Sequence, residues 1–523
     1  MTEPGLWIRG VRPLDGHRHA LGGAEPIDVG IEEGRIVAIA PAIDGPRRRG
    51  GDELDGGGAW MLPAFADSHL HLHTLAQQRG VLRLSRSHGE AALREALLGR
   101  LAGGDGVDWV VAQGWHDPLP EALVPAPRLW LDRLAPERPL WLFAADHHRA
   151  LLNSVALRAC GVPPDGHSGV LLEDAMMAAW REVPPLPADL DGVIADLHRL
   201  GITAVTSFDG SRAREVWAGR AEQGELPLRL RHSVPREELL ADPGRWSREG
   251  MAGGDPDRDG AFAALWVKVF LDGTLGSRTA WLKGDYDDAP GERGDERVCA
   301  AERQEIVDAV VGSHLQLAIH AIGDAAIAAA IEMITAVEQA RGRPGGAAPH
   351  RIEHVQLLDP ADLSRLRASG AVASLQPCHL LEDAAVGPER FGSRCRHVIP
   401  LRSLREAEVP VTLGSDAPIE SADPWVDLDA AVRRVDRAGR FPGGWIPEER
   451  VDFATALAGR TSAAATANLL PARWGRIEVG APADLQLLAC DDPREVRSID
   501  GARLVALLHR GRPLRLPDGT GPS

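Results

Sequence analysis

Two histidines at the end of a short apolar run have the residue type and spacing that could bind a metal ion. His69 and His71 lie near the end of the segment LPAFADSHLHLH, which runs from Leu62 to His73. On a β-strand, residues i and i+2 point to the same side, so both imidazoles would project together from the end of the strand. The chain has 19 histidines, so such a pair could also arise by chance and simply cap a strand.

Four residues far downstream make a metal centre the favoured interpretation. Each stands at or near the C-terminal end of an apolar run, and each can bind a metal or be activated to do so: Lys268 in LWVKVF, His320 in LQLAIH, His354 in HRIEH and Asp416 in VPVTLGSD. Imidazole nitrogens and carboxylate oxygens are ligands that Zn²⁺ and similar ions accept. The joint pattern favours a metal site at these strand ends, for which Zn²⁺ or a similar divalent ion is expected.

The segments that carry these residues alternate with helix-competent stretches, which predicts a parallel sheet with crossover helices. Eight strands are expected, at residues 63–69, 141–146, 202–208, 266–270, 315–320, 351–354, 371–376 and 409–416. Eight parallel apolar strands fit a (β/α)8 barrel, in which active sites lie at the C-terminal strand ends. The candidate ligands fall at those ends.

The two ends of the chain differ in character from its middle. Residues 1–60 and 469–523 hold short β-like segments separated by turns, which predicts one small β-sandwich domain built from both termini. Residues 61–468 are then the barrel, a closed domain whose ends lie close together. The stretch at about residues 75–140 is longer than one connection needs, so we expect an insertion near the barrel mouth.

Composition argues against several classes of function. The 523 residues carry a formal net charge of −17, which argues against nucleic acid or an anionic membrane as a partner. Neither a membrane-spanning apolar run nor the apolar core of a signal peptide is apparent. The five cysteines are scattered without CxxC spacing, so we expect a reducing, cytoplasmic location. A homodimer is compatible with these features.

Motifs along nearly the whole chain resemble the metal-dependent amidohydrolase superfamily, and specifically its family-3 branch of YtcJ-like and N-substituted formamide deformylase-like hydrolases. The matching segments include LPAFADSHLHL, GWHD, VKVFLDGTLGSRTAWL, IHAIGDAA, HRIEHVQLL, SLQPCHLLED and LGSDAPIESADP. Their order and spacing together are specific. The resemblance implies a TIM-like (β/α)8 barrel, a composite β-sandwich from both termini and a hydrolytic centre with one or two metals.

The resemblance also implies a role for each candidate ligand. His69 and His71 correspond to ligands of a first metal, and Asp416 corresponds to a metal-bound carboxylate that shuttles protons. Lys268 corresponds to a carbamylated lysine that bridges two metals, with His320 and His354 on the second metal. The alternative for Lys268 is a buried, unmodified lysine paired with a carboxylate, in which case one metal would suffice.

Five further residues are candidates for contact with a substrate: Trp115, His116, His148, Arg278 and His379. A few polar groups beside apolar wall candidates such as Phe208 and Phe270 are typical of a site for a small, partly hydrophobic molecule. Each candidate could instead fix a loop or an insertion by packing.

These features together predict a hydrolase that uses metal-activated water to cleave a non-peptide carbon–nitrogen bond, an amide or formamide, in a small molecule. Two alternatives stay open at this point. One is a ring-amidine deaminase with a single metal, and the other is a metal-free, non-catalytic scaffold.

Overall fold

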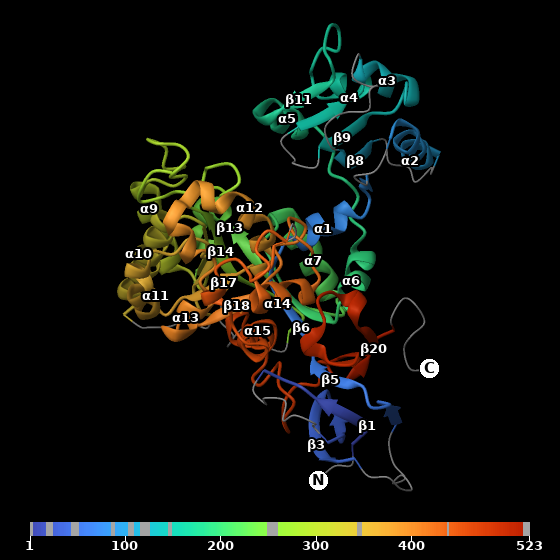
Figure 1. Cartoon of the computed structure of the whole chain (residues 1–523), viewed down its shortest axis with the longest axis vertical. Coiled ribbons are helices and arrows are strands. Elements are labelled where there is room, and N and C mark those ends of the chain that lie inside the picture. Colours follow the sequence, from blue (N-terminus) through green and yellow to red (C-terminus); the bar gives the residue numbers. More distant parts are fainter. Residues whose placement is uncertain are drawn as a thin grey trace. The chain divides into compact units, whose positions relative to one another are not determined.

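The computed structural model describes residues 4–16, 25–42, 52–84, 89–102, 109–115, 126–144, 149–247, 260–342, 348–436 and 439–515. The chain divides into two compact units, Met1–Leu72 together with Ile194–Ser523, and His73–Val193 (Figure 1). Within the described ranges, no helix combines the length and the apolar character needed to cross a membrane.

The first unit contains the predicted barrel. Its strands, as far as the structure describes the chain, form an eight-stranded parallel sheet in sequence order: β6 (Phe65–Leu70), β12 (Ile202–Ser207), β13 (Arg229–Pro235), β14 (Phe262–Phe270), β15 (Gln316–Ala321), β16 (Arg351–His354), β17 (Val372–Leu375) and β18 (Val411–Leu413). A parallel bridge between Leu70 and Ala417 joins the first strand to the segment after the last. The predicted (β/α)8 fold class is therefore confirmed.

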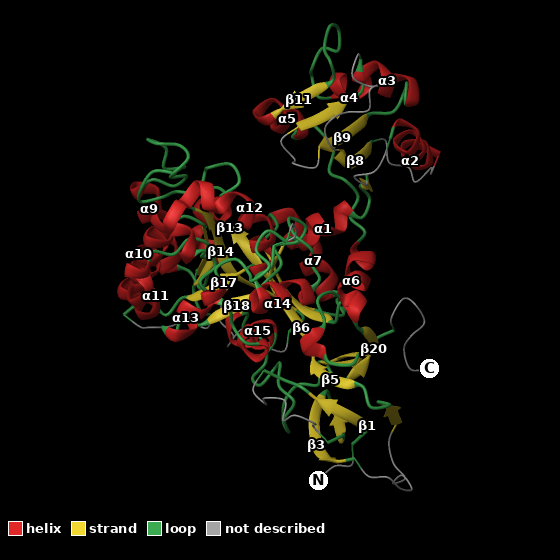
Figure 2. Cartoon of the chain, viewed as in Figure 1, coloured by secondary structure: helices red, strands yellow, loops and turns green. Residues whose placement is uncertain are grey.

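Helices lie between the barrel strands and, in the case of α14, α15 and α16, after the last of them, and Figure 2 shows helices around the sheet. They are α6 (Leu190–Arg199), α7 (Ser211–Glu222), α8 (Arg236–Ala241), α9 (Ala300–Gly312), α10 (Asp324–Arg341), α11 (Leu363–Ser369), α12 (Leu380–Phe391), α13 (Leu401–Glu406), α14 (Pro424–Arg433), α15 (Phe453–Arg460) and α16 (Ser462–Ala467). The longest of these, α10, stops where Gly342 adopts a φ of 64°. This left-handed conformation costs glycine little and ends a helix.

One predicted barrel strand was wrong, and one barrel strand was missed. The apolar segment at residues 141–146 falls on β9 (Leu140–Ala144), which pairs in the sheet of the second unit, and the third barrel strand is β13. A short apolar run does not reveal which sheet it joins. The strand β13 was missed because its sequence is polar although it is buried. Its Arg231 can be buried because the guanidinium donates hydrogen bonds to the carbonyls of Asn468 and Leu469.

A second sheet in the first unit combines strands from both ends of the chain, as predicted. Its order is β21-β20-β19-β5-β1-β2-β3, with β4 paired to β1. The strands are β1 (Leu6–Pro13), β2 (Ile27–Glu32), β3 (Arg35–Pro41), β4 (Asp52–Asp55), β5 (Trp60–Pro63), β19 (Leu485–Ala489), β20 (Arg503–His509) and β21 (Arg512–Pro513). Its core mixes N-terminal residues such as Ile8 and Val29 with C-terminal residues such as Leu487 and Leu508.

The second unit, His73–Val193, includes the insertion expected at residues 75–140 and continues well beyond it. Its sheet has the order β11-β10-β9-β8-β7 among the described residues, and apolar clusters around Leu131 and Trp141 form its core. Its strands are β7 (Leu82–Arg83), β8 (Val110–Trp115), β9, β10 (Arg149–Leu152) and β11 (Val170–Leu172). The helices here are α1 (Leu72–Gln78), α2 (Glu90–Ala102), α3 (Pro127–Leu134), α4 (Ser154–Ala159) and α5 (Glu173–Trp180).

Candidate metal centre

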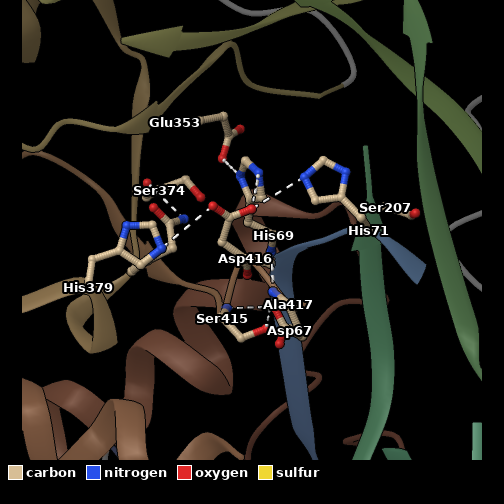
Figure 3. A network of polar contacts seen from close by, with 12 residues as sticks. Asp67, His69, His71, Ser207, Glu353, Ser374, His379, Ser415, Asp416 and Ala417 are labelled. Carbon is tan, nitrogen blue, oxygen red and sulfur yellow. Dashed lines mark hydrogen bonds and ion pairs between the residues drawn. The ribbon is translucent and has the colours of Figure 1, made fainter. Parts of the chain in front are cut away.

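The carboxylate of Asp416 lies among histidines that come from distant parts of the barrel sequence (Figure 3). Its Oδ1 is 3.5 Å from Nε2 of His69 and 3.3 Å from Nε2 of His71. Its Oδ2 is 3.5 Å from Nε2 of His379. The predicted His69, His71 and Asp416 are thus brought together, and His379, predicted as a substrate contact, lies against the same carboxylate.

Two groups of side chains in the described part of the chain have the spacing of metal ligands. One is His69, His71 and Asp416, and the other is His354, His379 and Asp416. In each group the ligand atoms lie within 4.8 Å of one another. Asp416 belongs to both groups, so its two carboxylate oxygens face two places where a cation could be bound.

Unusual backbone conformations place two of these residues. His354 has a φ of 76° and Asp416 a φ of 58°, in the left-handed region that residues other than glycine seldom adopt. Side chains alternate along β16, so Arg351 and Glu353 share one side and His354 would face the other if the strand simply continued. A left-handed residue at the strand end changes the direction of the chain, and such conformations concentrate at functional sites.

A glycine permits the close approach of β6 and the segment after β18. A Cβ built on Gly414 would lie 2.5 Å from the backbone nitrogen of His69. No real Cβ contact is that short, and the obstacle is backbone that cannot simply rotate away. Gly414 therefore sets how near Asp416 can lie to His69.

Lys268 is buried, with 5% of its surface exposed, and its Nζ lies 4.3 Å from the ring centroid of Phe208 and 4.8 Å from that of Phe270. Burial lowers the pKa of Lys268 to about 8, although the charges of Glu353 and Asp416 oppose the change. A lysine must lose its proton before it can be carbamylated, so this environment favours the chemistry predicted for it.

His320 lies next to the centre but in neither ligand group of the described residues. Its ring centroid is 4.4 Å from that of His354, and its Nε2 is 3.0 Å from the carbonyl oxygen of Gly273. Because a carbonyl only accepts hydrogen bonds, Nε2 is the protonated nitrogen. The neutral ring then carries its lone pair on Nδ1.

Burial favours the neutral form of three histidines in and beside the centre. It lowers the pKa of His69 to about 4 and that of His320 to about 3, and it holds the pKa of His354 well below its ordinary value. Neutral imidazole is the form that binds metals. Burial alone would raise the pKa of Asp416, but the hydrogen bond from His71 opposes this effect, and the pKa of the carboxyl lies well below its ordinary value.

Two ring nitrogens that lack a hydrogen-bond partner support a metal-binding role. His354 Nδ1 and His379 Nε2 are buried and make no hydrogen bond to any described residue. A buried polar atom without a partner is costly, so such atoms call for an explanation. A divalent ion fits this donor set, because it would accept the lone pair of a neutral imidazole at each position.

The other candidates for substrate contact have different surroundings. Trp115 is buried in the second unit, where its Nε1 donates to the carbonyl of Leu142, which is a packing arrangement. Arg278 is bound by Asp288 through both Nε and Nη2, so here its guanidinium fixes the loop that carries it. His116 and His148 lie outside the described residues.

Glu353 contacts the centre directly and was not predicted from the sequence. Oε2 of Glu353 lies 2.7 Å from Nδ1 of His69, and Glu353 is fully buried. The signal was present in HRIEH, because a carboxylate inside an apolar strand requires a partner. Arg351 at i−2, on the same side of the strand, is one such partner.

The sequence profile of the amidohydrolase family matches residues 52–515, so the chain belongs to this family. The predicted family is therefore confirmed. Two relatives with curated names extend over most of the chain. "Protein LONG AFTER FAR-RED 3" of Arabidopsis thaliana is 27% identical, and the match covers 92% of this chain and 87% of that protein. The N-substituted formamide deformylase of Arthrobacter pascens is 25% identical, and the match covers 87% of this chain and 88% of that protein.

A solved structure shows the same fold. The structure of an uncharacterized metal-dependent hydrolase from Pyrococcus horikoshii OT3 is similar with a TM-score of 0.75 and 25% sequence identity. The match covers 94% of this chain and 98% of the other. The fold and the family thus define this chain as a hydrolase of the amidohydrolase type.

The contact at Gly414 yields a test of the centre's geometry. We expect Gly414→Ala to lower stability by about 1–3 kcal/mol, the usual cost of overpacking, because its Cβ would meet the backbone of His69. Gly219→Ala is the matched control, since a Cβ at this position in α7 meets nothing within 4 Å. Thermal unfolding should show a lower Tm for the first variant alone. An unchanged Tm for Gly414→Ala would contradict the close approach.

Proposed function

We propose that the protein is a metal-dependent hydrolase that cleaves the carbon–nitrogen bond of an amide or formamide in a small, partly hydrophobic molecule. The observation that carries the proposal is the convergence of His69, His71, His354 and His379 on the carboxylate of Asp416. The centre lies at the C-terminal strand ends, where barrel enzymes have their active sites. The relative from Arthrobacter pascens, named for its action on N-substituted formamides, supports the choice of bond.

The side chains of the centre suit this reaction. His69, His71, His354 and Asp416 would hold one or two divalent ions, with zinc the expected metal, and a carbamylated Lys268 or His320 would complete the set. A bound divalent ion polarises a carbonyl group and lowers the pKa of water. Asp416 then accepts the proton of the attacking water at the end of β18 and passes it to the leaving nitrogen. An amide nitrogen leaves poorly unless it is protonated, so the same carboxylate acts twice.

Two exposed apolar side chains support a partly hydrophobic substrate. Phe270 stands two residues after Lys268 with 43% of its surface exposed, and Ile419 stands three residues after Asp416 with 72% exposed. Phe270 is the last residue of β14 and Ile419 follows β18, so both lie at the C-terminal ends that carry the centre. The sequence analysis named Phe270 as a wall residue but not Ile419. An apolar substituent on the substrate nitrogen would remove such surfaces from water.

A substrate panel tests the proposed reaction. The protein is prepared without chelators, its metal content is measured, and it is assayed after zinc loading against N-aryl and N-alkyl formamides, acetamides, cyclic ureides, N-acyl amino acids and cyclic amidines. We expect bound zinc and amine release from amides or formamides, with both lost after chelation and restored by zinc. Ammonia release from cyclic amidines alone would replace this proposal with a deaminase. A protein that binds no metal and turns over nothing would be a scaffold.

Replacement of Asp416 tests the proton transfer. We expect Asp416→Asn to reduce kcat by roughly 10²–10⁴-fold, the usual worth of general acid–base catalysis, with a much smaller change in KM. Metal analysis of the same sample separates loss of the base from loss of the ion. The matched control is Asp308→Asn, at an exposed position of α9. Near-normal turnover with metal bound would place the base elsewhere.

Phe270 tests the apolar part of the site. We expect Phe270→Ala to lower kcat/KM for N-aryl substrates by roughly 10–100-fold, because a buried phenyl contact contributes about 1.5–3 kcal/mol. N-methyl substrates should change little, because they cover little of the ring. Val479→Ala removes an apolar side chain of similar exposure, 52%, in the segment that precedes β19 and should affect neither class. Equal losses for both classes would mean that Phe270 supports the centre rather than the substrate.

A further inference from the structure

His69 lies between two carboxylates of the barrel interior. Its Nδ1 is 2.7 Å from Oε2 of Glu353, and its Nε2 is 3.5 Å from Oδ1 of Asp416 (Figure 3). His69 is 1% exposed and Glu353 is 0% exposed, so water does not compete for either contact. The orientation of this imidazole therefore depends on the side chains that touch it.

The contact with Glu353 fixes the position of the ring proton. Glu353 is ionised because it forms a fully buried ion pair with Arg351, whose Nε lies 2.7 Å from its Oε1. An ionised carboxylate only accepts hydrogen bonds, so the proton of the neutral His69 ring is on Nδ1. The lone pair is then on Nε2, the nitrogen that faces Asp416.

Glu353 is itself held by a buried arginine. Arg351 donates from Nε to Oε1 at 2.7 Å and from Nη2 to Oε2 at 3.2 Å. The guanidinium also donates to the carbonyl of Ser68 at 2.6 Å, to Ser374 Oγ at 3.0 Å and to Asn468 Oδ1 at 2.5 Å. These partners come from β6, from β17 and from the residue that follows α16.

Arg351 and Glu353 form a buried pair without net charge, and neither side chain has room to adopt many other positions. A fully paired polar network in a low-dielectric interior is rigid, and each member specifies the position of the next. Asn468 extends the network by donating from Nδ2 to Ser68 Oγ at 2.8 Å. Glu353 therefore cannot turn away from His69 without leaving the buried Arg351 with no counter-charge.

We infer that Glu353 is a positioning residue for the metal centre, which holds His69 with Nδ1 protonated and with Nε2 free to bind the ion. The inference rests on the proposed metal-dependent function and adds a residue to it. A carboxylate behind a metal-binding histidine orients the ring and makes its other nitrogen more basic. Arg351 and Asn468 in turn position Glu353.

The same domain offers a matched control with similar chemistry. His350 Nε2 lies 3.0 Å from Glu338 Oε1, and His350 is also buried. Its other nitrogen, Nδ1, accepts a hydrogen bond from the backbone of Leu317, so this histidine is fully used in packing. It belongs to neither ligand group of the described residues. Glu338→Gln thus removes a histidine-bound carboxylate without touching the centre.

The experiment measures zinc affinity by competition with a chelator for the wild-type protein, Glu353→Gln and Glu338→Gln. We expect Glu353→Gln to bind zinc about 10–100-fold more weakly, the usual effect of removing such a partner. Glu338→Gln should bind as tightly as the wild type. Glu353→Gln that binds zinc as tightly as the wild type would overturn the inference, because a purely structural Glu353 would not alter metal affinity.

Folding could fail in Glu353→Gln, because Arg351 would lose its counter-charge inside the barrel. The double variant Arg351→Met/Glu353→Gln removes both charges together and should show the same loss of zinc affinity. A crystal structure of the zinc-loaded wild type supplies a readout that needs no variant. We expect His69 to bind zinc through Nε2 with Nδ1 against Glu353, and ligation through Nδ1 would overturn the inference.

The outcomes separate this inference from the proposed function. A wild-type protein that binds no zinc contradicts the metal-dependent function itself, and the role of Glu353 fails with it. A wild-type protein that binds zinc and hydrolyses amides, while Glu353→Gln retains full affinity, contradicts only the role of Glu353.

Discussion

The ionised carboxylate of Asp416 is the feature on which the rest of the centre depends. Transfer of a carboxylate from water into a protein interior costs several kcal/mol unless positive charge or hydrogen bonds replace the lost hydration. Here the imidazoles of His69, His71 and His379 lie within 3.5 Å of its oxygens, and burial favours the neutral form of His69. A neutral ring such as that of His69 compensates a carboxylate only in part, so the cluster is suited to a cation.

The barrel adopts costly backbone conformations to bring these groups together. His354 and Asp416 occupy the left-handed region, and each such conformation costs on the order of 1–3 kcal/mol. The parallel bridge between Leu70 and Ala417 and the close approach at Gly414 hold the segment of Asp416 against β6.

Beneath the centre, the barrel interior is polar rather than purely apolar. Arg351 and Glu353 form a neutral buried pair, and Arg460 forms another ionic group with Asp67 and Asp427. A buried ionic group is stable only when each charge has its partner, so the position of one strand depends on the positions of the neighbouring strands that supply the partners. Asp67 shows this link, because it accepts hydrogen bonds from the backbone of both His69 and Ser415.

Much of this protein could be predicted from its sequence. Spacing and residue type predicted that His69, His71, His354 and Asp416 would lie together, because parallel strands place the residues at their C-terminal ends on one side of the barrel, and the structure brings them together. The strand-rich ends of the chain predicted a sheet built from both termini, which the structure contains. The apolar pattern did not predict β13, because this strand is polar in sequence but buried. Its Arg231 donates hydrogen bonds to carbonyls more than 230 residues away in the chain.

Only the tertiary structure decided which partners these residues have. The sequence could not show that His379 lies against Asp416 or that Glu353 contacts His69, because each contact joins segments that belong to different strands of the barrel or directly follow them. The sequence by itself determined the types of ligand and their places at strand ends, since these follow from local periodicity. Their protonation, orientation and pairing were decided by the tertiary structure, because burial and long-range hydrogen bonds exist only once the strands have assembled.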